Sequence, residues 1–139
     1  YVMVSTILCF YLGYFLYVIF PAAPPRYVLI NEFTRTFSGG MITRASDSAI
    51  NSVLPQTSRC AFPSLHSAVT TLSLIWAWKY IRRLFWILLP FGIGLILATV
   101  YLRHHYVIDL FAGFGLCILA YCFAPKLENW WQKKREKHS

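Results

Sequence analysis

The chain has 139 residues, of which 58% are hydrophobic and only 13% are charged, and its net charge is +8. Soluble domains carry about 25% charged residues on average, so this composition argues against an ordinary soluble protein. The basic residues form short clusters at the ends of apolar runs, which is typical of membrane proteins and excludes one continuous nucleic-acid-binding stripe.

Four apolar runs are candidates for membrane spans, because a helix that crosses a bilayer needs about 20 mostly apolar residues. Residues 1–20, 61–78 and 84–102 approach or reach this length, and residues 110–124 reach it when extended back to Tyr106. The runs are apolar on all sides, whereas a soluble helix bundle needs polar faces. The sequence therefore predicts an all-α integral membrane helical bundle with four transmembrane helices, forming a single domain over residues 1–139.

The first run begins at Tyr1 without a polar cap and without the basic region of a signal peptide. We therefore expect the chain to be a fragment, or to lack an N-terminal part. The next segment, residues 21–60, is long for a structureless connection. Its Phe33, Phe37, Ile42 and Ile50 predict short interfacial helices that cover the outer end of the spans.

The basic clusters predict an orientation. One cluster, Lys79, Arg82 and Arg83, lies between the second and third spans. The other follows the fourth span and contains Lys126, Lys133, Lys134, Arg135 and Lys137. Two crossings separate the clusters, so both lie on one side, which the positive-inside bias makes cytoplasmic. We therefore predict a basic cytoplasmic tail over residues 126–139, and an extracytoplasmic location for residues 21–60, for the start of the second span and for residues 103–109.

The second span begins with its most polar residues, in the stretch FPSLHS at residues 62–67. Proline is tolerated at a helix start and Ser64 is a good N-cap, so a helix is predicted to begin here. The free N–H groups of a helix start can bind an anion, and Ser64, His66 and Ser67 lie beside them. The alternative interpretation is a helix cap with an incidental interfacial histidine.

The third span is followed by Arg103, His104 and His105, and Asp109 comes four residues after His105. Residues four apart share a helix face, so Asp109 can fix the tautomer of His105 as the aspartate of a catalytic triad does. Asp109 also lies about one turn inside an apolar span, where an ionisable residue indicates a functional site. The alternative is a structural His–Asp pair. His104 points elsewhere on a helix and is expected at the interface.

The two polar patches, residues 62–67 and 103–109, are predicted to lie at the same depth on one face of the membrane. There they supply the groups for phosphoryl transfer. One histidine can act as nucleophile and the other as general acid. Arginines bind phosphate with paired hydrogen bonds. The candidates for this contact are Arg103 beside the histidines, Arg26 at the outer end of the first span, and Arg59 seven residues before His66.

The stretches FPSLHS and YLRHHYVIDLFAG (residues 101–113) closely resemble the second and third signature motifs of the type 2 phosphatidic acid phosphatase superfamily. That superfamily includes vanadium haloperoxidases and the inositol phosphorylceramide synthases of fungi and protozoa. The resemblance covers residues 21–115 and implies a six-helix fold of which this chain lacks the first two helices. It also implies a nucleophilic His105 oriented by Asp109, and a His66 that protonates the leaving oxygen. The implied enzyme acts on a membrane lipid phosphate or phospholipid through a phosphohistidine, without a metal or other cofactor.

The chain departs from the family pattern in two motifs. The lysine of the first motif is absent, so only Arg26 of that motif can be carried over. Ala98 and Thr99 stand where the third motif usually opens with Ser-Arg, and we expect Arg103 to supply the missing guanidinium, with Ser64, Ser67 and Arg59 as further phosphate contacts. The form TVYLRHHY leans toward the inositol phosphorylceramide synthase branch.

Three classes of function are compatible with these residues. The first is a lipid phosphatase or phosphotransferase, with water or an alcohol as acceptor. The second is a membrane metal hydrolase that uses His66, His104, His105 and Asp109 as ligands, a set that suits zinc. Adjacent histidines on a helix point about 100° apart, which weighs against this set. The third is a non-catalytic protein that holds an anionic lipid with its arginines.

Overall fold

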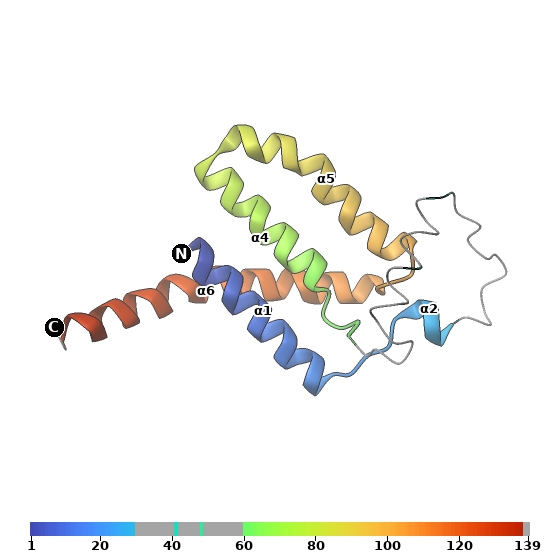
Figure 1. Cartoon of the computed structure of the whole chain (residues 1–139), viewed down its shortest axis with the longest axis horizontal. Coiled ribbons are helices and arrows are strands. Elements are labelled where there is room, and N and C mark those ends of the chain that lie inside the picture. Colours follow the sequence, from blue (N-terminus) through green and yellow to red (C-terminus); the bar gives the residue numbers. More distant parts are fainter. Residues whose placement is uncertain (30–40, 42–47, 49–59, 138–139) are drawn as a thin grey trace.

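The computed structural model describes residues 1–29, 41, 48 and 60–137, and this part of the chain is almost entirely helical. Its helices are α1 (Val2–Ile19), α2 (Pro25–Val28), α4 (Leu65–Tyr80), α5 (Arg82–Tyr101) and α6 (Val107–Glu136). The four long helices form a bundle in which α4 contacts α1, α5 and α6, and α1 also contacts α6 (Figure 1). For the described residues, the predicted all-α fold is confirmed.

Three helices in the described part, α1, α5 and α6, are long and apolar enough to cross a membrane. Helix α4 has 16 residues and is about 24 Å long, which is shorter than the hydrocarbon core of about 30 Å. The prediction of four spans is thus confirmed for three. Residues 61–64, expected inside the second span, precede α4, because Ser64 adopts an extended conformation and caps the helix. The six-helix family fold stays a prediction.

The core lies where α1, α4 and α6 meet. It contains Cys9, Leu65, Ala68, Leu72, Trp76, Leu116, Cys117 and Ala120. The indole N–H of Trp76 donates a 2.8 Å hydrogen bond to Ser5 Oγ, which satisfies a buried polar group between α4 and α1. Many other large apolar side chains are exposed, such as Val18 and Phe91, and a membrane would cover them.

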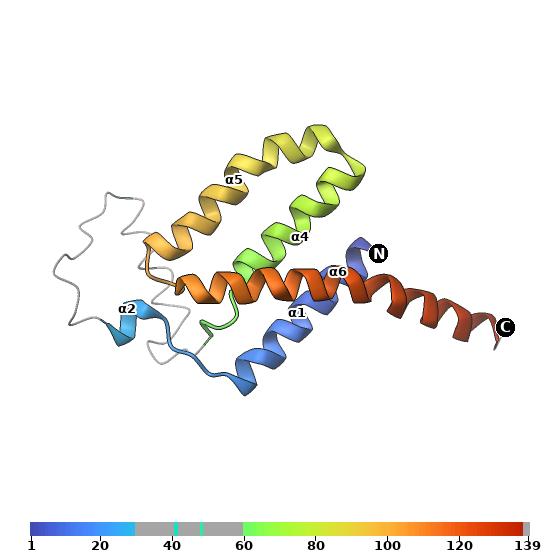
Figure 2. The same ribbon diagram turned by 180° about the vertical axis from the view of Figure 1, so that it is seen from behind.

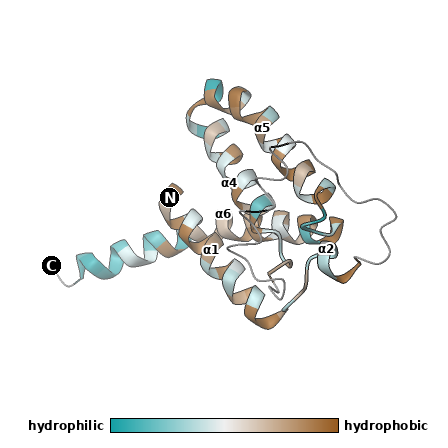
Figure 3. Ribbon diagram, turned by 45° about the vertical axis from the view of Figure 1, so that its right-hand side comes forward, coloured by the Kyte–Doolittle hydropathy of each residue, from teal (hydrophilic) through white to brown (hydrophobic). Residues whose placement is uncertain are grey.

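Helix α6 is the longest helix among the described residues, with 30 residues and a length of about 45 Å. It continues through Pro125 into the segment expected as a basic tail, and Figure 2 shows its last turns projecting beyond the other helices. These last turns are hydrophilic, whereas the part of α6 inside the bundle is mainly apolar (Figure 3). The described part of the tail is therefore a continuation of α6.

The two polar patches meet at one end of the bundle. The end of α1, the start of α4, the end of α5 and the start of α6 all lie there, together with α2 (Figure 1). Helix α2 is short, and the expected interfacial residues Phe33, Phe37, Ile42 and Ile50 lie outside the described residues, as does Arg59.

Candidate active site

The start of α4 follows the sequence prediction. Ser64 is the N-cap, and its Oγ accepts a 3.3 Å hydrogen bond from the backbone N–H of Ser67. His66 is the second residue of the helix, and its side chain is exposed. The cap therefore fixes the direction in which the first turn presents His66.

Ser64 and Ser67 also join α4 to α6. Ser67 Oγ lies 2.9 Å from the carbonyl oxygen of Ser64 and 3.3 Å from that of Leu110, in the first turn of α6. The backbone N–H of Ser64 donates to the carbonyl oxygen of Asp109 at 3.0 Å. Both serine side chains are fully buried. In this structure they link the helices, and their contact with a phosphate stays a prediction.

The α5–α6 turn, residues 102–106, delivers His105 to the bundle interior. Arg103 has a positive φ of 61°, a left-handed conformation that commonly follows the end of a helix. The carbonyl oxygen of Thr99 accepts hydrogen bonds from the backbone N–H groups of His104 and His105, at 2.9 and 3.2 Å. These contacts tie the turn to the last turn of α5.

The prediction that His105 and Asp109 share one helix was wrong. Helix α6 begins at Val107, so His105 precedes it and only Asp109 lies in it. They are nevertheless close, with 3.8 Å between His105 Nδ1 and Asp109 Oδ2, and both side chains are buried. The turn brings the two residues together because Asp109 caps α6 by accepting a 2.7 Å hydrogen bond from the backbone N–H of Tyr106.

A backbone carbonyl orients the imidazole of His105. Its Nδ1 lies 2.8 Å from the carbonyl oxygen of Ala61, which can only accept a hydrogen bond. Nδ1 therefore carries a proton, and in the neutral ring Nε2 keeps its lone pair. The backbone N–H of Ala61 in turn donates to the carbonyl oxygen of Ala22 at 3.0 Å, so the link after α1 supports this contact.

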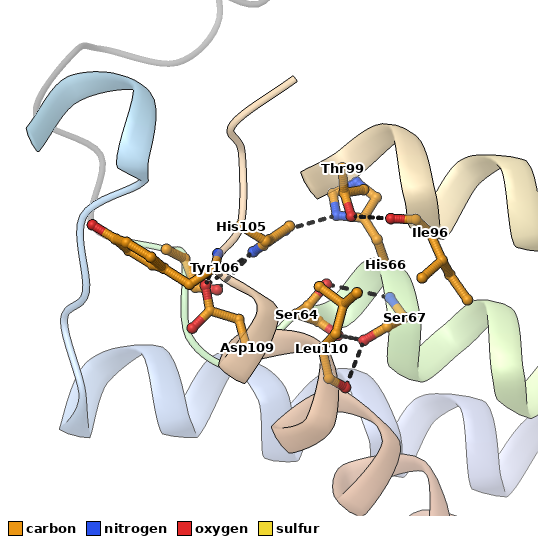
Figure 4. Close-up of polar contacts among 10 residues, drawn as sticks. Ser64, His66, Ser67, Ile96, Thr99, His105, Tyr106, Asp109 and Leu110 are labelled. Carbon is orange, nitrogen blue, oxygen red and sulfur yellow. Dashed lines mark hydrogen bonds and ion pairs between the residues drawn. The ribbon is translucent and has the colours of Figure 1, made fainter. Parts of the chain in front are cut away.

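His66 and His105 face each other across the start of α4 and the α5–α6 turn (Figure 4). His66 Nδ1 lies 3.3 Å from His105 Nε2, with the ring centroids 5.5 Å apart and the ring planes at 60°. Burial lowers the pKa of His105, and its contacts with Ala61 and Asp109 oppose that effect. An exposed histidine thus faces a buried, neutral one across a short gap.

The predicted phosphate-binding arginines are only partly described. Arg103 lies in the α5–α6 turn, two residues before His105, and its side chain is partly buried. Arg26 is the second residue of α2, at the same end of the bundle (Figure 1). Arg59 lies outside the described residues. Their contact with a phosphate stays a prediction.

Within the described residues, no three His, Cys, Asp or Glu side chains gather closely enough to hold a metal ion. The proposed set of His66, His104, His105 and Asp109 all lies within this part of the chain. The geometry therefore does not support the metal-hydrolase alternative.

Sequence reasoning missed three structural contributors to the site. Ala61 and Thr99 act through their carbonyl oxygens, for which side-chain identity gives no signal. Gly113 allows α6 to approach the start of α4, because an added Cβ would collide with Ser67 Oγ and the carbonyl oxygen of Ser64. The overlooked signal for this close approach was a glycine inside a predicted helix, Gly113.

Comparisons with known proteins agree with the motifs. Residues 1–123 match the model of the PAP2 superfamily. The chain is 36% identical over 67 residues to the inositol phosphorylceramide synthase catalytic subunit aur1 of Schizosaccharomyces pombe, covering 48% of this chain and 16% of that protein. It is 31% identical over 106 residues to the corresponding subunit AUR1 of Saccharomyces cerevisiae, covering 68% of this chain and 26% of that protein.

The chain spans about a quarter or less of the length of these two relatives. The comparison with solved structures found no significant match. The three apolar helices and the relatives together indicate a multi-pass membrane protein. Because the family match covers most of the chain and includes both histidine motifs, the chain belongs to the PAP2 superfamily.

Proposed function

We propose that this chain carries the catalytic site of a membrane enzyme that breaks a lipid phosphoester through a phosphohistidine and passes the phosphoryl group to water or an alcohol. One observation carries this proposal. His105 is buried and its Nδ1–H donates a hydrogen bond to the carbonyl oxygen of Ala61. Its Nε2 faces His66 Nδ1 at 3.3 Å. A neutral imidazole held in this way is a preorganised nucleophile.

In the first step, the Nε2 lone pair of His105 attacks phosphorus. A P–N bond forms and the P–O bond to the leaving alcohol breaks. His66, in its imidazolium form, gives its Nδ1 proton to the leaving oxygen and becomes neutral. The phosphate enters between the two rings, and the exposed ring of His66 turns aside to admit it. The positive charge that develops on His105 is stabilised by the Ala61 carbonyl oxygen and by Asp109, 3.8 Å away.

In the second step, His66 acts as the base. It removes a proton from the acceptor hydroxyl, whose oxygen attacks phosphorus and displaces His105. The P–N bond breaks and the nucleophile recovers its lone pair. Water as acceptor gives a phosphatase, and an alcohol gives a phosphotransferase, with the same residues in the same roles.

The likeness to two inositol phosphorylceramide synthase subunits favours an alcohol as acceptor. In this more specific form of the proposal, the transferred group carries inositol and the acceptor is the hydroxyl of a ceramide. The guanidinium groups of Arg103, Arg26 and Arg59 are proposed to neutralise the phosphate oxygens, because arginine matches their geometry with paired hydrogen bonds.

The charge distribution supports an extracytoplasmic active site. Lys79 and Arg82 flank the α4–α5 connection, and the basic end of α6 lies beyond the bundle, both away from the histidines (Figure 1). The positive-inside bias places these basic segments in the cytoplasm. The histidine pair then faces the opposite side of the membrane.

The test is an assay of purified full-length protein against phosphatidic acid and phosphatidylinositol, with and without ceramide, in the presence of a strong chelator. We expect turnover by the wild type and none by His105→Ala. Lipid binding without turnover would support a non-catalytic lipid binder instead. Activity that disappears with the chelator would support metal catalysis.

A further inference from the structure

We propose that a groove between α4 and α5 holds one hydrocarbon chain of the lipid substrate and thereby aligns its headgroup with the histidine pair. This inference rests on the proposed function. The groove has a volume of about 250 Å³ and is lined by Val69, Thr70 and Ser73 of α4 and by Leu88, Phe91 and Leu95 of α5. Neither His66 nor His105 is among its lining residues.

The groove is continuous with the candidate active site along α4. Val69, Thr70 and Ser73 follow His66 by three, four and seven residues, so all four share one helix face. His66 stands at the start of this face, about one turn from the groove lining. A phosphate bound at His66 would therefore lie near the end of the groove.

The groove is also continuous with the site along α5. Leu88 and Leu95 lie eleven and four residues before Thr99, on the face that leads to it. The carbonyl oxygen of Thr99 accepts the 3.2 Å hydrogen bond from the backbone N–H of His105. Both walls thus lead to the catalytic histidines, one to His66 and the other to His105.

The lining indicates which part of a lipid occupies the groove. Among the residues that the structure describes, no ionisable side chain lines the groove, so it suits a hydrocarbon chain rather than a charged headgroup. Phe91 is 73% exposed and Leu95 is 44% exposed, so the groove opens toward the membrane interior, where lipid chains lie. The helices remain close at Gly92, whose added Cβ would lie 3.0 Å from Leu74 Cδ1 and 3.1 Å from Thr70 Cγ2.

The groove contributes alignment more than affinity. A lipid chain that enters it from the bilayer leaves one apolar environment for another, so the hydrophobic effect adds little. Packing against fixed helices instead restricts where the attached phosphate can lie, and such positioning accelerates the chemical step. The groove is therefore expected to select for chain length and not for headgroup charge.

The test compares Leu95→Trp, which fills the groove, with Leu97→Trp, the same change at a more exposed position of α5 outside the groove. The substrates are phosphatidic acids with hexanoyl or oleoyl chains, and p-nitrophenyl phosphate, which has no chain. We expect Leu95→Trp to lower kcat/KM for the oleoyl lipid about 10- to 100-fold, with p-nitrophenyl phosphate hydrolysis unchanged. Leu97→Trp should behave as wild type.

A second readout does not depend on turnover. Phosphatidic acid with a photoreactive group on its acyl chain should cross-link to groove residues in the wild type and in Leu97→Trp, and not in Leu95→Trp or Ser73→Leu. Cross-links that ignore both groove substitutions overturn the groove proposal, even where the enzyme is active. Equal losses of kcat/KM on all three substrates in Leu95→Trp also overturn it, because they indicate that Leu95 packs against another segment of the protein and not against a lipid chain. Absence of wild-type turnover overturns the proposed function, whatever the cross-links show.

Discussion

At the residue scale, His105 contacts two acceptors that have different effects. The carbonyl oxygen of Ala61, at 2.8 Å from Nδ1, makes the hydrogen bond that fixes the ring. Asp109 Oδ2, at 3.8 Å, is too far for a hydrogen bond and adds a negative charge instead. Orientation and electrostatics are therefore supplied by two different groups, unlike in a catalytic triad, where one aspartate supplies both.

This division predicts the effect of Asp109→Asn. His105 must be unprotonated to attack, so kcat/KM falls as the pH drops through its lowered pKa. The negative charge of Asp109 raises that pKa, so its removal should move the acid limb of the pH profile to still lower pH. The plateau of kcat/KM at higher pH should fall about tenfold, because one charge interaction with His105 is lost. The measurement is the pH dependence of kcat/KM for both proteins.

Asp109→Asn removes the negative charge but keeps the hydrogen bond that caps α6. An asparagine Oδ1 can still accept the hydrogen bond from the backbone N–H of Tyr106, so α6 keeps its cap. An unchanged acid limb would show that Asp109 does not act on His105. A loss of about ten-thousandfold would show that Asp109, and not Ala61, fixes the tautomer.

Arg103→Lys tests the proposed phosphate contact of the third motif. Arginine offers a planar fork for two phosphate oxygens, and lysine offers one compact charge. Losing a charge-assisted contact costs about 1.5–3 kcal/mol, so kcat/KM should fall roughly 10- to 150-fold. The measurement is kcat/KM beside Arg26→Lys under the same conditions. Wild-type activity in the Arg103 variant would leave Arg26 and Arg59 as the candidates.

At the element scale, the close contact between α4 and α6 holds the site together. Ser64 and Ser67 bond to the first turn of α6, and Gly113 leaves space for them. In Gly113→Ala, the new Cβ would meet a backbone oxygen that cannot move alone. We expect a loss of about 1–3 kcal/mol in stability, measured by thermal unfolding in detergent, together with reduced activity.

Gly115→Ala is the matched control, because an added Cβ there meets no described atom within 4 Å outside its own stretch of helix. Alanine is favoured over glycine in a helix by about 1 kcal/mol, so this variant should be as stable as the wild type or more stable. Equal destabilisation by the two substitutions would contradict the proposed close contact.

The helices show which parts of the structure were predictable. Apolar runs and the Pro63-Ser64 start predicted α1, α5, α6 and the beginning of α4, because these features depend on side-chain chemistry. The position of His105 before α6 was not predictable, since the turn is built from backbone hydrogen bonds to Thr99. The two histidine motifs predicted residues that the structure brings close together, and their catalytic roles stay a prediction. The spacing argument for Asp109 was wrong, because His105 precedes α6.

At the scale of the whole molecule, the central place of α4 was also not predictable. Its sequence is apolar on most sides, so the pattern does not distinguish a face that packs on protein from one that meets lipid. It was predictable that the two motifs meet at one end of the bundle. The chain runs away from that end and back again between them, so both motifs lie on the same side. The structure places both motifs at that one end (Figure 1).

The proposed orientation predicts which side of the membrane exposes Cys60. This thiol is exposed and precedes Ala61 of the site. In sealed vesicles with known orientation, a membrane-impermeant thiol reagent should label Cys60 from the extracytoplasmic side. The control is Lys133→Cys in a Cys60→Ser background, which should be labelled only from the cytoplasmic side. The reverse pattern would contradict the proposed sidedness.

The central claim is that His105 forms a covalent bond to phosphorus. In His66→Ala, a substrate with a good leaving group, p-nitrophenyl phosphate, should still react in the first step, while the second step lacks its base. Rapid quenching with radiolabelled substrate should then trap an acid-labile phosphohistidine, and peptide mapping should place it on His105, with no label in His105→Ala. Absence of a covalent intermediate, or a label on His104, would contradict the account.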